Sequence, residues 1–380
     1  MAGLIRRIGS IVFSGVLVAS TVTAEPRVIE GTTAGGALYA LAIPDQWGGD
    51  LVVYGHGIVD PLAPVALPST QDHFVLLRDA LLQRGFAVAS SSFSENGYAL
   101  KDAVQRLHEL SGLFTARVGP PAHVYLVGHS LGAAAVQVLA ERYASQYDGA
   151  LAMCGLVGGT PRELQYIGNA RVLFDYFFPN VLPGDVLTVP STLIFAPGRD
   201  EFNDALAALM TGFGAPGNPT LQFAAAAGLP FANGMELVQA GLTVLGFQLR
   251  FTNDLLRLTH GHPFFDNTNA VYPGAANAGV GRFTAAPDAI NYFDHYFSPT
   301  GQISIPMLTL HTTRDPAIPL FHEAEYAALV AEQGASGWLT QRTTNAFGHC
   351  AFTDGQVLSA FDALIDWSRT GVQPAGGPGF

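Results

Sequence analysis

Short apolar runs alternate along the chain with longer stretches in which apolar residues recur at helical spacing. The runs are rich in β-branched residues and are bounded by Gly or polar residues, a pattern that is typical of strands. The predicted strands are 51–54, 86–91, 124–127, 150–156, 307–312 and 339–344, and the predicted helices are 71–83, 100–113, 131–147, 323–332 and 356–367. Strands and helices that alternate in this way predict an α/β fold with a mostly parallel sheet and right-handed crossovers.

The alternation stops between residues 160 and 303, where Gly, Pro, Phe and Ala abound and only helical patches stand out. We therefore predict a sheet domain formed by 25–159 and 304–371, and a largely helical lid inserted at 160–303. An opening hairpin is expected over 27–47. Residues 372–380 are expected to be a loose tail.

Residues 1–24 have the layout of a secretory signal peptide. Arg6 and Arg7 precede an apolar run, and small residues lead to Ala24, after which cleavage is expected. The alternative is a membrane anchor, but the apolar run is shorter than the roughly 20 residues needed to span a bilayer. The expected location is secreted or periplasmic, without a stable membrane anchor.

The composition excludes some partners. Charged residues make up 13% of the chain, the net charge is −12, and Lys101 is the single lysine. Such a chain has no basic groove for nucleic acid. The P-loop pattern and paired metal-ligand spacings are missing from the sequence, so neither a cofactor nor a metal is expected.

A Gly-x-Ser-x-Gly motif lies between a predicted strand and a predicted helix. It runs from Gly128 to Gly132 and centres on Ser130. In this context a sharp turn exposes the serine hydroxyl while small glycines let the strand and helix pass closely. Ser130 is the predicted nucleophile, and the alternative is a serine that merely caps the helix.

A serine nucleophile needs a histidine base. His349 follows the last predicted strand, in a loop that can fold back over the serine turn. It is preferred over His56, His260, His262 and His311, for each of which a structural role is favoured.

The base in turn needs an acid that orients it. Asp315 follows the predicted strand 307–312 and gives the chain order Ser, Asp, His. Asp200 is a serious rival because the run 192–196 before it imitates the same strand-then-acid pattern. Accepting Asp200 would leave strand 307–312 without a place in the alternation, so Asp315 is preferred.

Two backbone amides are expected to form the oxyanion hole. One belongs to Leu131, next after the nucleophile. The other is assigned to Ile58, in the loop after strand 51–54, with Gly57 as the alternative. The alternative interpretation of that loop is a simple flexible turn.

Cys154 and Cys350 are the two cysteines. Export makes a disulfide possible, and both residues are expected near the carboxyl ends of the strands. Two buried free thiols remain the alternative.

These motifs together resemble the α/β-hydrolase superfamily, in particular its secreted, lidded serine esterase-like members. The resemblance rests on Tyr54–Ile58, Gly128–Gly132, Asp315 and Gly348–Cys350. It implies a cofactor-free acyl-enzyme mechanism and a lid over the pocket, although the insertion matches by position alone. The Phe-rich segments of the lid are expected to supply that pocket, and they include Phe174, Phe177, Phe178, Phe264 and Phe265. The expected substrate is a small-molecule or polymeric ester. A serine peptidase, an acyltransferase and a non-catalytic binding module are the competing interpretations.

Overall fold

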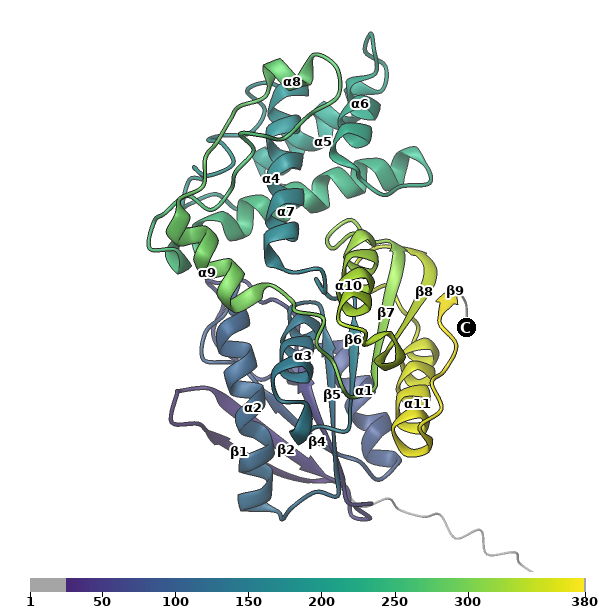
Figure 1. The fold of residues 1–380 in the computed structure, drawn as a ribbon. Coiled ribbons are helices and arrows are strands. Elements are labelled where there is room, and N and C mark those ends of the chain that lie inside the picture. Colours follow the sequence, from purple (N-terminus) through teal and green to yellow (C-terminus); the bar gives the residue numbers. More distant parts are fainter. Residues whose placement is uncertain (1–24, 379–380) are drawn as a thin grey trace, which may run out of the picture.

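The computed structural model describes residues 25–378, and a nine-stranded sheet forms its centre (Figure 1). The strands are β1 (Arg27–Thr32), β2 (Leu38–Ile43), β3 (Asp50–Gly55), β4 (Ala87–Ser91), β5 (His123–His129), β6 (Gly149–Met153), β7 (Met307–Arg314), β8 (Leu339–Phe347) and β9 (Gly377–Pro378). Their order in the sheet is β1-β2-β4-β3-β5-β6-β7-β8-β9. The pairs β1–β2 and β2–β4 are antiparallel, and all pairs from β4 to β9 are parallel. The fold class predicted from the sequence is confirmed.

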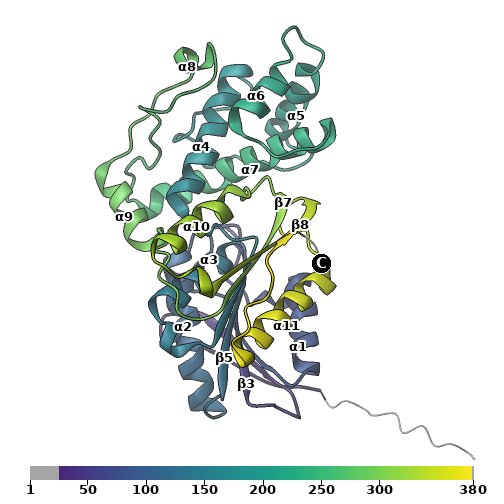
Figure 2. The same ribbon diagram turned by 45° about the vertical axis from the view of Figure 1, so that its right-hand side comes forward.

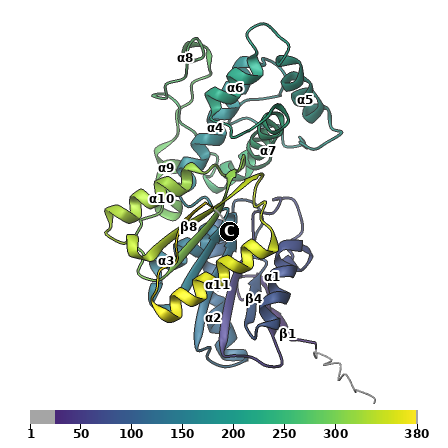
Figure 3. The same ribbon diagram turned by 90° about the vertical axis from the view of Figure 1, so that its right-hand side faces the viewer.

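Helices cover both faces of this sheet (Figure 3). The helices of the sheet domain are α1 (Asp72–Gln83), α2 (Leu100–Arg117), α3 (Leu131–Arg142), α10 (Phe321–Glu332) and α11 (Asp354–Thr370). Apolar residues of α1 and α11 pack with one face, and those of α2, α3 and α10 pack with the other. Since both faces are covered, β3, β4 and β6 are buried along their whole length, which explains why apolar residues predominate in them without a polar alternation.

Six helices lie between β6 and β7 in the chain and stand above the carboxyl ends of the strands (Figure 2). They are α4 (Thr160–Phe177), α5 (Asp200–Gly212), α6 (Pro219–Ala227), α7 (Gly234–Leu258), α8 (Ala276–Gly279) and α9 (Pro287–Phe297). This insertion has a hydrophobic core of its own, which includes Phe174 and Phe223. The sheet domain therefore folds around one core on each face, and the insertion around a third.

The chain after α11 differs from the expected loose tail. Residues 373–378 follow β8, where Gln373 Nε2 donates to the Leu339 carbonyl at 2.8 Å and β9 pairs with Arg342 and Thr343. The open edge of β8 offers unpaired backbone groups, and the tail satisfies them. The Gly and Pro residues of this segment concealed the strand.

The signal peptide predicted over 1–24 lies outside the described residues. Within 25–378, none of the helices combines the length and the apolar character that crossing a membrane requires.

Candidate active site

Ser130 occupies a strained turn between β5 and α3. Its backbone has φ 54° and ψ −120°, a conformation that non-glycine residues rarely adopt. The two motif glycines make the turn possible. A Cβ atom on Gly128 would lie 2.3 Å from the Gly132 carbonyl oxygen, and one on Gly132 would lie 2.1 Å from the Gly55 carbonyl oxygen. The close approach of α3 to β3 and β5 thus requires glycine at both positions.

His349 lies between Ser130 and Asp315. Its Nε2 is 2.8 Å from Ser130 Oγ, and its Nδ1 is 2.7 Å from Asp315 Oδ2. A ring that donates from Nδ1 to the carboxylate leaves Nε2 as the acceptor for the serine hydroxyl. The structure therefore brings together the three residues that the sequence predicted as a triad.

Asp315 is fully buried just beyond the end of β7. Its second carboxylate oxygen, Oδ1, accepts hydrogen bonds from the amides of Ala317 at 2.9 Å and Ile318 at 3.0 Å. Both oxygens are thus held in place, and Oδ2 is directed at His349.

The rival acid, Asp200, lies elsewhere. It is exposed at the first residue of α5, and the preceding run 192–196 forms no strand. The sequence imitates a strand there because the run is apolar, but Phe195 packs into the core of the insertion instead.

Within the described part of the chain, the other histidines that the sequence offered as the base form no hydrogen bond with Ser130. His260 and His262 are exposed after α7. His311 is buried in β7, where its ring bonds Glu323 Oε1 at 3.1 Å and the Ile318 carbonyl at 2.8 Å. His56 is buried against Phe93, with ring centroids 3.9 Å apart, and burial lowers its pKa.

The predicted oxyanion residues all approach Ser130. A Cβ atom on Gly57 would lie 3.3 Å from Ser130 Cβ, and Ile58 and Leu131 line one pocket together with Ser130. Within residues 25–378, the amides of Ile58 and Leu131 donate to no protein acceptor. His56 Nδ1 bonds the Gly57 carbonyl at 2.7 Å, which fixes the loop. The amide of Gly57 likewise donates to no acceptor within the described residues, so Leu131 and either Ile58 or Gly57 have amides available to an oxyanion.

Cys154 and Cys350 form a disulfide, with their Cα atoms 5.2 Å apart. Cys154 follows β6, and Cys350 adjoins His349, so the bond ties the base loop to the carboxyl edge of the sheet. The one group of three potential metal ligands in the described part of the chain comprises these two cysteines and His349. Its two sulfurs are joined to each other.

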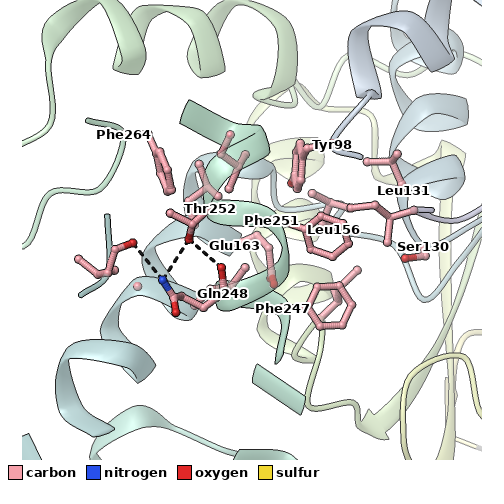
Figure 4. Close-up of a pocket in the computed structure, with 17 residues that line it drawn as sticks. Tyr98, Ser130, Leu131, Leu156, Glu163, Phe247, Gln248, Phe251, Thr252 and Phe264 are labelled. Atoms are coloured by element: carbon pink, nitrogen blue, oxygen red, sulfur yellow. Dashed lines mark hydrogen bonds between the residues drawn. The ribbon is translucent and has the colours of Figure 1, made fainter. Parts of the chain in front are cut away.

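An apolar pocket extends from Ser130 between the sheet domain and the insertion (Figure 4). In this view Ser130 lies at one end and Phe264 toward the other, with Phe247 and Phe251 of α7 between them. The sheet domain contributes Ile58, Tyr98, Leu131, Leu156 and Ile318. The insertion contributes Glu163, Leu164, Ile167, Gly168, Val186, Phe247, Gln248, Phe251, Thr252, Leu255 and Phe264.

Most of the aromatic residues expected in this pocket lie elsewhere. Of the five named from the sequence, only Phe264 lines it, whereas Phe174, Phe177, Phe178 and Phe265 pack in the insertion's own core. Phe247 and Phe251 were missed because the sequence shows an ordinary buried helix there. The buried carboxyl of Glu163 was also missed, since no motif surrounds it.

A second pocket adjoins the first one at Ser130. Its lining includes Ser130, Ile58 and His349, together with His73 and Arg250. His349 lines this pocket but is not among the residues of the first one. The two pockets share Ile58, Ser130, Phe247 and Phe251, so they adjoin at the nucleophile, and the base lines only the second.

The sequence matches no protein family model, and no curated protein matches it at the level that marks a relative. Solved structures do resemble the fold. An esterase from Aspergillus oryzae has a TM-score of 0.51 and 14% identity, over 92% of this chain and 80% of its own. Feruloyl esterase B from the same organism has a TM-score of 0.50 and 15% identity, over 91% of this chain and 80% of its own. The chain has the fold of the α/β-hydrolase superfamily, as its motifs predicted.

Proposed function

We propose that the protein is a serine hydrolase that cleaves carboxylic esters through an acyl-enzyme on Ser130. One observation carries the proposal: Ser130 Oγ lies 2.8 Å from His349 Nε2, while His349 Nδ1 lies 2.7 Å from the buried Asp315. A nucleophile, a base and an orienting acid at these distances are what acyl transfer to serine requires.

The reaction follows from these positions. His349 Nε2 accepts the proton of Ser130 as Oγ attacks the carbonyl carbon, and the oxyanion is held by the amides of Leu131 and Ile58 or Gly57. His349 then gives the proton to the leaving alcohol oxygen, which leaves the acyl group on Ser130. Water activated by His349 hydrolyses that ester and restores the enzyme.

The two pockets support an assignment of the two halves of the substrate. The leaving oxygen must lie beside His349, because it receives the proton from Nε2. The pocket that includes His349 and Arg250 is therefore assigned to the alcohol, and the apolar pocket below α7 to the acyl group.

A serine peptidase or an acyltransferase uses the same triad. The apolar acyl pocket favours an ester, and the two fungal structures of similar fold are esterases. An acyltransferase would pass the acyl group to an added alcohol rather than to water, which product analysis distinguishes.

The test is a panel of p-nitrophenyl esters of graded acyl length beside an aminoacyl anilide, with Ser130→Ala as the control. We expect ester hydrolysis, with loss of about 10⁴- to 10⁶-fold in the variant. Preferential cleavage of the anilide would favour a peptidase over an esterase. Full activity in the Ser130→Ala variant would refute the assignment of Ser130 as the nucleophile.

We also propose that the enzyme is exported, as a secreted or periplasmic protein. The signal-like pattern of 1–24 and the Cys154–Cys350 disulfide support export, because disulfides persist in oxidising compartments. Amino-terminal sequencing of protein exported from a bacterial host should begin at Glu25. A chain retained in the cytoplasm with Met1 intact would contradict the proposal.

A further inference from the structure

Glu163 is a carboxyl group in an otherwise mostly apolar acyl pocket. It lies in the first turn of α4, is only 3% exposed, and lines the same pocket as Ser130 (Figure 4). The triad does not use it. A buried carboxyl is costly unless it is partnered, so its hydrogen bonds reveal what it can do there.

One carboxyl oxygen of Glu163 is occupied by His322. The amide of Gly158 donates to His322 Nδ1 at 3.1 Å, so Nδ1 carries no proton. Burial lowers the pKa of His322 to about 3, which keeps the ring neutral with its proton on Nε2. Nε2 lies 2.9 Å from Glu163 Oε2 and donates to it.

The other oxygen, Oε1, makes no hydrogen bond within residues 25–378. Burial, followed by the negative charge of Asp315, raises the pKa of Glu163 well above its ordinary range, while His349 and His311 oppose the rise. The remaining titratable groups that interact with it are His322 and the phenols Tyr98 and Tyr166. On its pocket side α7 presents the neutral side chains of Gln248 and Thr252. Because Oε2 accepts from His322, the proton of the neutral acid belongs on Oε1.

We propose that Glu163 Oε1 donates a hydrogen bond to an oxygen atom in the acyl part of the substrate, so that the enzyme prefers an ether-, hydroxyl- or carbonyl-bearing acyl group over a plain alkyl chain. The inference rests on the proposed function, since the pocket is the one beside Ser130. A buried donor without a partner discriminates against a substrate that cannot pair with it.

The test compares p-nitrophenyl hexanoate with its analogues in which an ether oxygen replaces one methylene at successive positions along the chain. The measured quantity is the ratio of kcat/KM for each ether ester to that for hexanoate. Each ratio is divided by the same ratio for uncatalysed alkaline hydrolysis, which removes the difference in intrinsic reactivity between the esters. We expect one ether position to be favoured by the wild type, and Glu163→Leu to reduce that preference by about 3- to 10-fold.

Glu163→Gln is the informative partner variant. Its amide oxygen can accept from His322 while its NH₂ group donates into the pocket, so the preference should persist. In the wild type the preference should fall as pH rises through the raised pKa of Glu163, because the ionised carboxylate cannot donate. In Glu163→Gln it should stay constant. Protonation of His349 lowers kcat/KM for both esters of a pair by the same factor, so the ratio of the two values does not change.

Glu141→Gln is the control variant, because it makes the same Glu-to-Gln substitution at a residue outside the pocket. Glu141 receives hydrogen bonds from Thr300, Gly301 and Tyr326, outside the pocket lining, and the ratio should not change. Equal preference in the wild type and Glu163→Leu, or no preference at any ether position, would overturn the inference. Should Glu163→Leu fail to fold, the pH dependence of the preference tests the inference instead. The same pH dependence in the wild type and in Glu163→Gln would then overturn it. Failure of the wild type to hydrolyse any ester would instead overturn the proposed function.

Discussion

Asp315 is held on both sides of its carboxylate. The amides of Ala317 and Ile318 donate to Oδ1, and His349 Nδ1 donates to Oδ2 at 2.7 Å. The acid can therefore select the His349 tautomer and stabilise its charged form as Ser130 loses its proton.

Replacing Asp315 by Asn should lower kcat/KM by about 10⁴-fold, because the amide no longer holds the required tautomer. The exposed Asp200, replaced in the same way, should leave the rate within about twofold, since surface changes away from a site have small effects. Ester hydrolysis by both variants at matched folded concentration checks this. A larger loss in Asp200→Asn would refute the assignment of the acid.

His311 supports the Asp315 turn from within β7. Although burial disfavours a charged ring, hydrogen bonding to Glu323, the charges of Glu323 and Asp315, and a hydrogen bond to the Ile318 carbonyl raise its pKa. A group with a raised folded-state pKa contributes stability fully below its unfolded value of about 6.5, and that stability is lost as pH rises through the folded value.

The free energy of unfolding should therefore contain a component that declines as pH rises above about 6.5 and that is missing in His311→Gln. Urea unfolding of both proteins over a series of pH values measures it. Parallel pH profiles for the wild type and His311→Gln would contradict the predicted charge on His311.

At the scale of elements, the disulfide joins the end of β6 to the loop between β8 and α11. The two cysteines are 196 residues apart in the sequence, and the whole insertion lies between them. Cys350 is the neighbour of His349, so the covalent link also restrains the base.

Replacing both cysteines by Ser should lower the free energy of unfolding by about 3–5 kcal/mol, because a long loop is released in the unfolded chain. It should also lower kcat more than it raises KM, since the His349 loop loses its tether. Denaturant unfolding and ester kinetics measure the two effects. Unchanged stability, or two alkylatable thiols in the unreduced wild type, would show that the bond does not form.

The sequence predicted the insertion to be a lid, and its helices α4 and α7 supply much of the wall of the pocket that we assign to the acyl group. Phe264 lies toward the far end of that pocket from Ser130 (Figure 4). Phe174, by contrast, is fully buried in the core of the insertion. The two aromatics should therefore respond differently to truncation.

Phe264→Ala should reduce kcat/KM for an octanoate ester by about 10-fold more than for an acetate ester, because only the long chain reaches that end. Phe174→Ala, the matched control, should cost about 3–5 kcal/mol of stability and leave the chain-length preference unchanged. Equal losses on both esters in Phe264→Ala would mean that this residue only holds the insertion together.

At the scale of the whole molecule, local patterns predicted the sheet domain well. The strand, the turn at Ser130 and α3 are adjacent in sequence, so the motif and its setting could be interpreted together. Chain order then selected Asp315 and His349, because the carboxyl ends of parallel strands meet at one edge of the sheet.

Features that depend on tertiary packing could not be predicted. Whether Phe251 lines the pocket depends on how α7 lies over the sheet, and periodicity shows only that the residue is on an apolar face. The hydrogen-bonding partner of Glu163 comes from α10 and is oriented by the turn before α4, and these two segments are far apart in the sequence. The pairing of β9 depends on an open edge that β8 presents in the folded molecule.

Covalent trapping gives the sharpest test of Ser130 as the nucleophile. The wild type, incubated with a fluorophosphonate probe and analysed by intact mass and peptide mapping, should gain one adduct, located on Ser130, and lose its ester hydrolysis in the same proportion. Ser130→Ala should gain none while remaining folded. An adduct on another residue that accompanies the loss of activity, or an unlabelled wild type that still hydrolyses esters, would contradict an acyl-enzyme on Ser130.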